Sequence, residues 1–129
     1  MNIPEDLKYS KEHEWVRIQG NTVTVGITDY AQDKLGEIVF VELPEEGEEV
    51  IKDEPFGAVE SVKSVNDVFA PINGKVLELN DPLVDSPELI NDDPYGEGWM
   101  IRVEISSIDD LKDLLTAQQY TAYLAEELE

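Results

Sequence analysis

Lys63 has the clearest chemical potential in the chain, because it lies between two β-forming segments, 55–62 and 65–70. Only Lys63 and Ser64 join these segments, a spacing that is typical of a tight β-hairpin. A lysine at a turn is usually just solvated, but this chain has only 9 Lys and Arg residues. An amine at a rigid, protruding tip is also accessible to an enzyme that would acylate it. Lys63 is therefore the first candidate for a modification site.

The single histidine, His13, stands beside Glu14 and Trp15 at the start of another β-forming segment. A His–carboxylate pair can act as a general base, but no nucleophile motif such as G-x-S-x-G accompanies it. The 30 acidic residues show no spacing that singles out an acid/base pair. We therefore expect no catalytic residues, a surface or structural His13, and a mostly solvated acidic face.

We expect no metal site either. The chain has no cysteine, which excludes disulfides, thiolate zinc sites and iron–sulfur clusters. The loop 91–98 is rich in Asn and Asp, but Tyr95 stands where an EF-hand needs an oxygen ligand and Arg102 where it needs a glutamate. A turn is the simpler interpretation of this loop.

Length and charge narrow the function further. The chain has 129 residues, which suits one domain, and a formal net charge of −21. Nucleic acids and anionic membrane surfaces are bound through Lys and Arg, so neither is an expected partner. Basic patches on partner proteins could recognise the acidic surface, with binding that weakens in salt. No membrane span and no signal or transit peptide is visible, so we expect a cytoplasmic protein.

We expect mainly β-strands around the lysine. The clearest hairpin joins 13–19 to 22–27 through a Gly-Asn turn. Residues 28–36 then predict a short helix that begins with a capping Thr and ends at a Gly. Residues 80–98 read as loop-rich. The remaining β-forming segments are 37–43, 55–62, 65–70, 75–79 and 99–105.

The pattern changes after the last of these strands. Ser107 is a candidate cap for a helical turn through Leu115. Thr116 and Gln119 have the spacing of a capping box that opens a final helix. One face of that helix is apolar and consists of Ala117, Tyr120, Leu124 and Leu128.

Together the segments predict a single domain over 1–129. Its β core would span about 10–105, with short helices, and the tail at about 107–129 would be an amphipathic helix lying on the core. Many short strands with regular turn signals indicate a barrel or a sandwich.

Nearly the whole chain resembles the H protein of the glycine cleavage system. The segment ESVK inside a β-hairpin is specific, and the segments taken together are more specific still. They are HEWV (13–16), VGITDYAQ (25–32), LGEIVFVELPEEG (35–47), GAVESVKS (57–64), APINGKV (70–76), PELIN (87–91) and DPYGEGWM (93–100), followed by the acidic tail. The resemblance implies a hybrid barrel-sandwich core of the lipoyl type.

In that family the lysine of ESVK carries lipoic acid in amide linkage, and the match places it at Lys63. The related biotin carriers have methionines on both sides of their lysine, whereas this chain has Val62 and Ser64. The motif also makes Glu60, Ser61, Val62 and Ser64 candidates for recognition by lipoate-attaching enzymes.

The resemblance suggests a place for the loaded arm as well. Positions matching Glu14 and Asp67 are associated in the family with holding it. A sulfur-bound aminomethyl group is cationic and prone to hydrolysis, so it would gain from a sheltered cleft with carboxylates. This chain departs from the family by placing Glu12 just before His13, which could add to that site or compete with it.

The implied function is a monomeric shuttle without catalytic residues of its own. The glycine decarboxylase, a pyridoxal-phosphate enzyme called the P protein, would leave an aminomethyl group on a lipoyl sulfur. The tetrahydrofolate-dependent aminomethyltransferase, the T protein, would take the one-carbon unit. The dihydrolipoyl dehydrogenase, the L protein, would reoxidise the arm and pass electrons to NAD. An alternative is an H-like protein that relays lipoyl groups to other acceptors, and a stand-alone enzyme would need turnover without lipoate.

Overall fold

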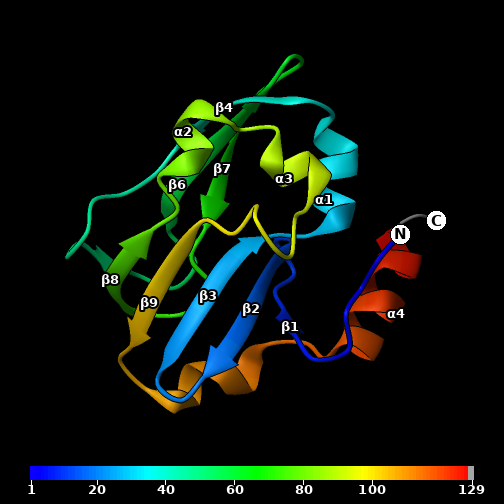
Figure 1. Ribbon diagram of the computed structural model, residues 1–129. Helices are drawn as coiled ribbons and strands as arrows, with labels where there is room; N and C mark the ends of the chain where they lie inside the picture. The colour runs from blue at the N-terminus through cyan, green and yellow to red at the C-terminus, as the bar shows by residue number, and fades with distance from the viewer. Residues whose placement is uncertain (128–129) are drawn as a thin grey trace.

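The structure is a computed structural model that describes residues 1–127, and it is built on two antiparallel β-sheets (Figure 1). The larger sheet has six strands, in the order β1 (Lys8–Tyr9), β2 (Glu14–Gln19), β3 (Thr22–Ile27), β9 (Ile101–Ile105), β8 (Gly74–Leu79) and β5 (Glu49–Val50). The smaller sheet has three strands, in the order β4 (Ile38–Glu42), β6 (Pro55–Ser61) and β7 (Val65–Phe69). The prediction of a mainly β fold with short helices and a C-terminal helix is confirmed.

The main hydrophobic core lies between the two sheets. It joins buried side chains of the larger sheet, such as Val23 and Val103, to Val59 and Val68 of the smaller sheet. Burial of such apolar side chains is the chief source of stability for a fold made of short strands.

The predicted short helix is confirmed as α1 (Asp29–Leu35). Its first turn is capped by Thr28, whose Oγ1 accepts a hydrogen bond from Ala31 N at 3.2 Å. It ends at Gly36, which has a φ of +82°, in the region that favours glycine. Local sequence signals therefore fix both ends of this helix.

The stretch 80–98 is not simply a loop, because it contains two one-turn helices, α2 (Pro82–Asp85) and α3 (Leu89–Asp92). Pro82 stands at the first position of α2, where its missing N–H costs nothing. The turn after Ser107 is a 3-10 helix, η1 (Ile108–Asp113).

The final helix, α4 (Ala117–Glu127), begins at the predicted capping box. Thr116 N donates to Gln119 Oε1 at 2.9 Å, and Gln119 N donates back to Thr116 Oγ1 at 3.1 Å. The helix packs beside β1 (Figure 1). Beneath it lies a second apolar cluster, in which the rings of Tyr9 and Tyr120 stack with their centroids 4.7 Å apart. Leu128, predicted on the same face, lies outside the described residues.

No helix within residues 1–127 is both long enough and apolar enough to cross a membrane.

Candidate functional site

The hairpin of β6 and β7 protrudes from one end of the molecule, and Lys63 lies in its turn (Figure 1). The turn is held by Ser61, whose side chain is only 4% exposed. Its Oγ accepts hydrogen bonds from Lys63 N at 3.2 Å and Ser64 N at 3.3 Å. Ser61 N also donates to Ser64 O at 2.8 Å, which closes the hairpin. Lys63 is thus an exposed amine on an ordered backbone.

Replacing Ser61 by alanine tests whether the hydroxyl orders this tip. Ser61→Ala leaves two backbone N–H groups without their acceptor, so amide hydrogen exchange at Lys63 and Ser64 should speed up about fivefold, the factor for one ordinary hydrogen bond. The matched control is Ser64→Ala, because Ser64 is exposed and its hydroxyl only accepts from Asn66 Nδ2. Equal exchange rates in the two variants would contradict the role of Ser61.

The other candidates near the lysine are placed differently. Val62 and Ser64 are exposed beside Lys63 in the turn, whereas Glu60 is half-buried in β6 between its cross-strand partners Phe40 and Val65. Another protein can therefore contact Glu60, Val62 and Ser64. Ser61 instead holds the turn in its conformation.

The Lys63 side chain lies against the C-terminal end of α1. A Cβ placed on Gly36 would lie 3.9 Å from Lys63 Cε and 4.0 Å from Nζ. Among residues 1–127, the Lys63 side chain has no hydrogen-bond or ion-pair partner. The amine is consequently free to react, and it sits at one end of the helix that also walls the neighbouring cleft.

That cleft has a volume of about 520 Å³ and lies between α1, β7, the start of β2 and the end of α4. Its polar lining is mostly acidic, with Lys34 as the one ammonium among the described lining residues. The acidic side chains are Glu12, Glu14, Asp67 and Glu127. The apolar part of the lining consists of Ile27, Tyr30, Ala31, Leu35, Val59, Val68 and Phe69. Such a lining suits a ligand with an apolar stem and a cationic end.

Glu14 and Asp67, the two predicted arm-docking residues, both line this cleft. Glu14 is 2% exposed, and its Oε1 accepts a hydrogen bond from Ser10 Oγ at 2.6 Å. Asp67 is exposed on β7, an edge strand, and it also borders a second groove next to Glu42 and Glu45. Glu12 lines the same cleft as Glu14.

Burial raises the pKa of the Glu14 carboxyl to about 8, and the hydrogen bond from Ser10 offsets part of that rise. At neutral pH the carboxyl therefore holds a proton while no cation is near it. A cationic group in the cleft would favour the release of this proton, so Glu14 becomes a negatively charged carboxylate when a cation binds.

This pKa predicts a pH-dependent stability that Glu14→Gln should remove. The unfolded chain releases the proton near the ordinary glutamate pKa, whereas the folded chain keeps it up to about pH 8. The wild type gains from this proton at low pH and loses the gain as pH rises. The unfolding free energy of Glu14→Gln relative to wild type should therefore rise by about 3.5 kcal/mol between about pH 5 and 8. Denaturant titrations measure it, with exposed Glu104→Gln as control, and parallel profiles would refute it.

Sequence reasoning missed Asn91 as a positioning residue. Its Nδ2 donates to Gln32 Oε1 and to Gly36 O, both at 2.9 Å, and its Oδ1 accepts from Ile38 N at 2.9 Å. Asn91 thus joins α3 to the point where α1 ends and β4 begins, and it holds Gly36, the residue against which the Lys63 side chain lies. The only sequence signal for Asn91 was its place in the segment PELIN. Its three partners lie more than 50 residues away, so no local pattern could identify them.

Asn91 and Asp92 end α3, and the rest of the loop, 93–98, is a turn held by the backbone and side-chain oxygens of Asp93. Asp93 O accepts from Gly96 N at 3.1 Å and from Gly98 N at 2.9 Å, and Asp93 Oδ2 accepts from Glu97 N at 3.0 Å. Within residues 1–127, no group of three or more His, Asp or Glu side chains could hold a metal ion.

The sequence matches the family described as glycine cleavage H-protein over residues 7–127. A glycine cleavage system H protein of Staphylococcus saprophyticus is 55% identical over 126 residues, which are 98% of this chain and 100% of the relative. One from Anaeromyxobacter is 57% identical over 127 residues, 98% of this chain and 99% of the relative. The crystal structure of an H protein from Mycobacterium marinum superposes with a TM-score of 0.88 at 43% identity, over 95% of this chain and 99% of that one. The chain therefore belongs to the glycine cleavage H-protein family, the non-catalytic lipoyl carriers of glycine cleavage.

Proposed function

We propose that Lys63 carries the lipoyl group in amide linkage and that the chain, as one carrier domain, presents it to the enzymes of glycine cleavage. The observation that supports this most is the position of Lys63. Its amine is exposed at an ordered hairpin tip and lies against the end of α1, next to an acidic cleft. The bound lipoyl group supplies a dithiol, chemistry that a chain without cysteine lacks.

The residues of the cleft shelter the end of the arm. The apolar wall from α1 and β7 excludes water, which slows hydrolysis of a group held there. The carboxyl oxygens of Asp67 and Glu14 face the cationic end of the arm. Glu14 releases its proton when that cation binds. Glu12 adds a further negative charge at the same cleft.

The partners follow from this assignment. The P protein loads the arm with an aminomethyl group, the T protein unloads it, and the L protein reoxidises it, while lipoate-attaching enzymes recognise the tip at Glu60, Val62 and Ser64. Ser61 contributes by fixing the turn.

A monomer whose net charge is −21 suits transient binding to three enzymes one after another, because charge-guided complexes form and dissociate quickly.

Glycine/CO2 exchange with the P protein tests this function against a lipoyl relay. Both functions require lipoate on Lys63, so the mass of the protein does not separate them. A carrier of glycine cleavage should make exchange strongly dependent on its lipoylated form, with unlipoylated protein at background. Lipoylated protein that supports no exchange but passes lipoyl groups to other acceptors would contradict the proposal and favour the relay.

A further inference from the structure

We propose that His13 is a positioning residue, held in the neutral form with its proton on Nε2 by a one-way chain of hydrogen bonds. This series of hydrogen bonds joins the end of α4 to the N-terminus of α1, and so connects two walls of the cleft. The consequence for the lipoyl arm rests on the function proposed above. The hydrogen-bond chain itself does not.

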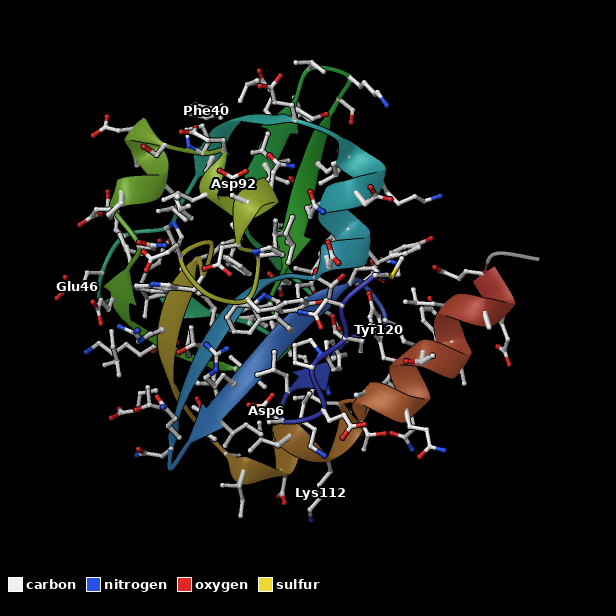
Figure 2. All side chains as sticks on the ribbon, turned by 45° about the vertical axis from the view of Figure 1, so that its right-hand side comes forward. Asp6, Phe40, Glu46, Asp92, Lys112 and Tyr120 are labelled. Carbon is white, nitrogen blue, oxygen red and sulfur yellow. The ribbon has the colours of Figure 1, made fainter. Side chains whose placement is uncertain are left out.

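The contacts form a continuous series. His13 Nε2 lies 3.3 Å from Glu127 Oε2, and His13 Nδ1 lies 2.9 Å from the hydroxyl of Tyr120. That hydroxyl lies 2.8 Å from Thr28 Oγ1, which in turn accepts from Ala31 N at 3.2 Å. Figure 2 shows Tyr120 pointing from α4 toward the N-terminal strands, where it is fully buried.

The direction of the series follows from counting hydrogens. Thr28 is completely buried, and among the described residues its hydroxyl hydrogen has one acceptor within reach, the oxygen of Tyr120. If Thr28 donates to Tyr120, the hydroxyl hydrogen of Tyr120 must go to His13 Nδ1. A ring nitrogen that accepts carries no proton, so the proton of the neutral ring is on Nε2.

The other end of the series requires the same arrangement. A protonated Nε2 can donate to the Glu127 carboxylate, whereas a bare Nε2 would face that carboxylate with a lone pair. If the ring gained a second proton, Nδ1 would have to donate to Tyr120, and Tyr120 to Thr28. The buried Thr28 hydroxyl would then have no acceptor within the described chain, at the cost of an unmade hydrogen bond.

Other groups around the ring modulate this balance. On α4 it faces Glu127 and the rings of Tyr120 and Tyr123, and on α1 the ring of Tyr30 and the ammonium of Lys34. Glu12 lies next to it in the chain. Burial lowers the pKa of His13, and the charges of Glu127 and Glu12 counteract part of that. The reversal penalty at Thr28 acts in the same direction as burial.

The backbone makes His13 a junction as well. His13 O accepts from Thr28 N at 3.0 Å, and its φ of +72° is unusual for a residue other than glycine. The side chain and the backbone of one residue thus hold Thr28, the cap of α1. Because α1 walls the cleft and ends beside Lys63, His13 sets the position of that wall.

Nitrogen-15 spectra of the imidazole test the inference on the intact protein. The chain has one histidine, so the spectrum contains one ring and needs no assignment. At pH 7 we expect Nε2 to be protonated and Nδ1 to be an acceptor. A proton on Nδ1, a doubly protonated ring or an even mixture of the two neutral forms would overturn the proposal, whatever the lipoyl arm does.

Two phenylalanine variants test the series itself. Tyr120→Phe removes the donor to Nδ1, so the ring should gain its second proton about fivefold more readily, a rise of about 0.7 in its pKa. Tyr95→Phe is the matched control, because the buried Tyr95 hydroxyl accepts from Asp29 N and donates to Asn2 O, and bonds neither His13 nor its partners. An equal rise in both variants, or a fall in Tyr120→Phe, would contradict the proposal. If Tyr120→Phe does not fold, the wild-type spectrum decides alone.

Discussion

Lys63→Arg should fold like the wild type, receive no lipoyl group and reduce glycine cleavage to background. Arginine keeps the positive charge at the tip, and the lysine side chain has no partner among residues 1–127 that the change could break. A guanidinium stays charged at any accessible pH, so it is a poor acceptor for an acyl group. Mass spectrometry after treatment with a lipoate-attaching enzyme measures the first effect, and the reconstituted reaction measures the second.

The matched control is Lys112→Arg. Lys112 is also exposed and lies in η1, and it pairs only with Asp109 at 3.0 Å. The Lys112→Arg variant should be lipoylated on Lys63 and active, like the wild type. A lipoyl group on another lysine of Lys63→Arg, or residual activity above background, would contradict the assignment of the site.

The double variant Glu14→Gln/Asp67→Asn should lose the protection of the loaded arm. It keeps the size of both side chains and one acceptor oxygen on each, but it removes their two negative charges from the cleft. Hydrogen bonds to a charged group are worth about twice those between neutral groups, so hydrolysis of the loaded form should be about tenfold faster. Release of formaldehyde and ammonia from the isolated loaded protein measures it.

The control for this variant is Glu104→Gln/Asp85→Asn, two exposed positions outside the cleft with the same change of charge. It should match the wild type. Adding Glu12→Gln to the double variant tells whether Glu12 supports the site, in which case hydrolysis speeds up again, or competes with it, in which case it slows. Hydrolysis of the double variant at the wild-type rate would contradict docking in this cleft.

Features that depend on neighbouring residues could be predicted from the sequence. The cap at Thr28, the left-handed Gly36 and the box between Thr116 and Gln119 lie within a few residues of their partners, and the structure confirms them. The hairpin with Lys63 at its tip belongs to the same class, since both of its segments are β-forming and its connection is short. These signals are local hydrogen bonds, and they act wherever the chain folds.

Features that depend on distant partners could not be predicted. The contact between His13 and Tyr120 spans 107 residues, and that between Asn91 and Gly36 spans 55. Nothing in either local sequence specifies the partner, because the sheets and α4 bring them together. Ser10 was equally hidden as the hydrogen-bond donor to Glu14, since a serine four residues before a glutamate is common in any chain. The division of the strands between two sheets is likewise set by long-range packing.

Lys63 should carry both the lipoyl group and, on it, the aminomethyl group that comes from glycine. Intact mass with a peptide map around Lys63 tests it most directly, measured after lipoylation and again after incubation with glycine and the P protein. We expect one lipoyl group, on the peptide that contains Lys63, and a further gain of one aminomethyl group that requires glycine. A lipoyl group at any other lysine, or no glycine-dependent gain on the lipoylated protein, would contradict it.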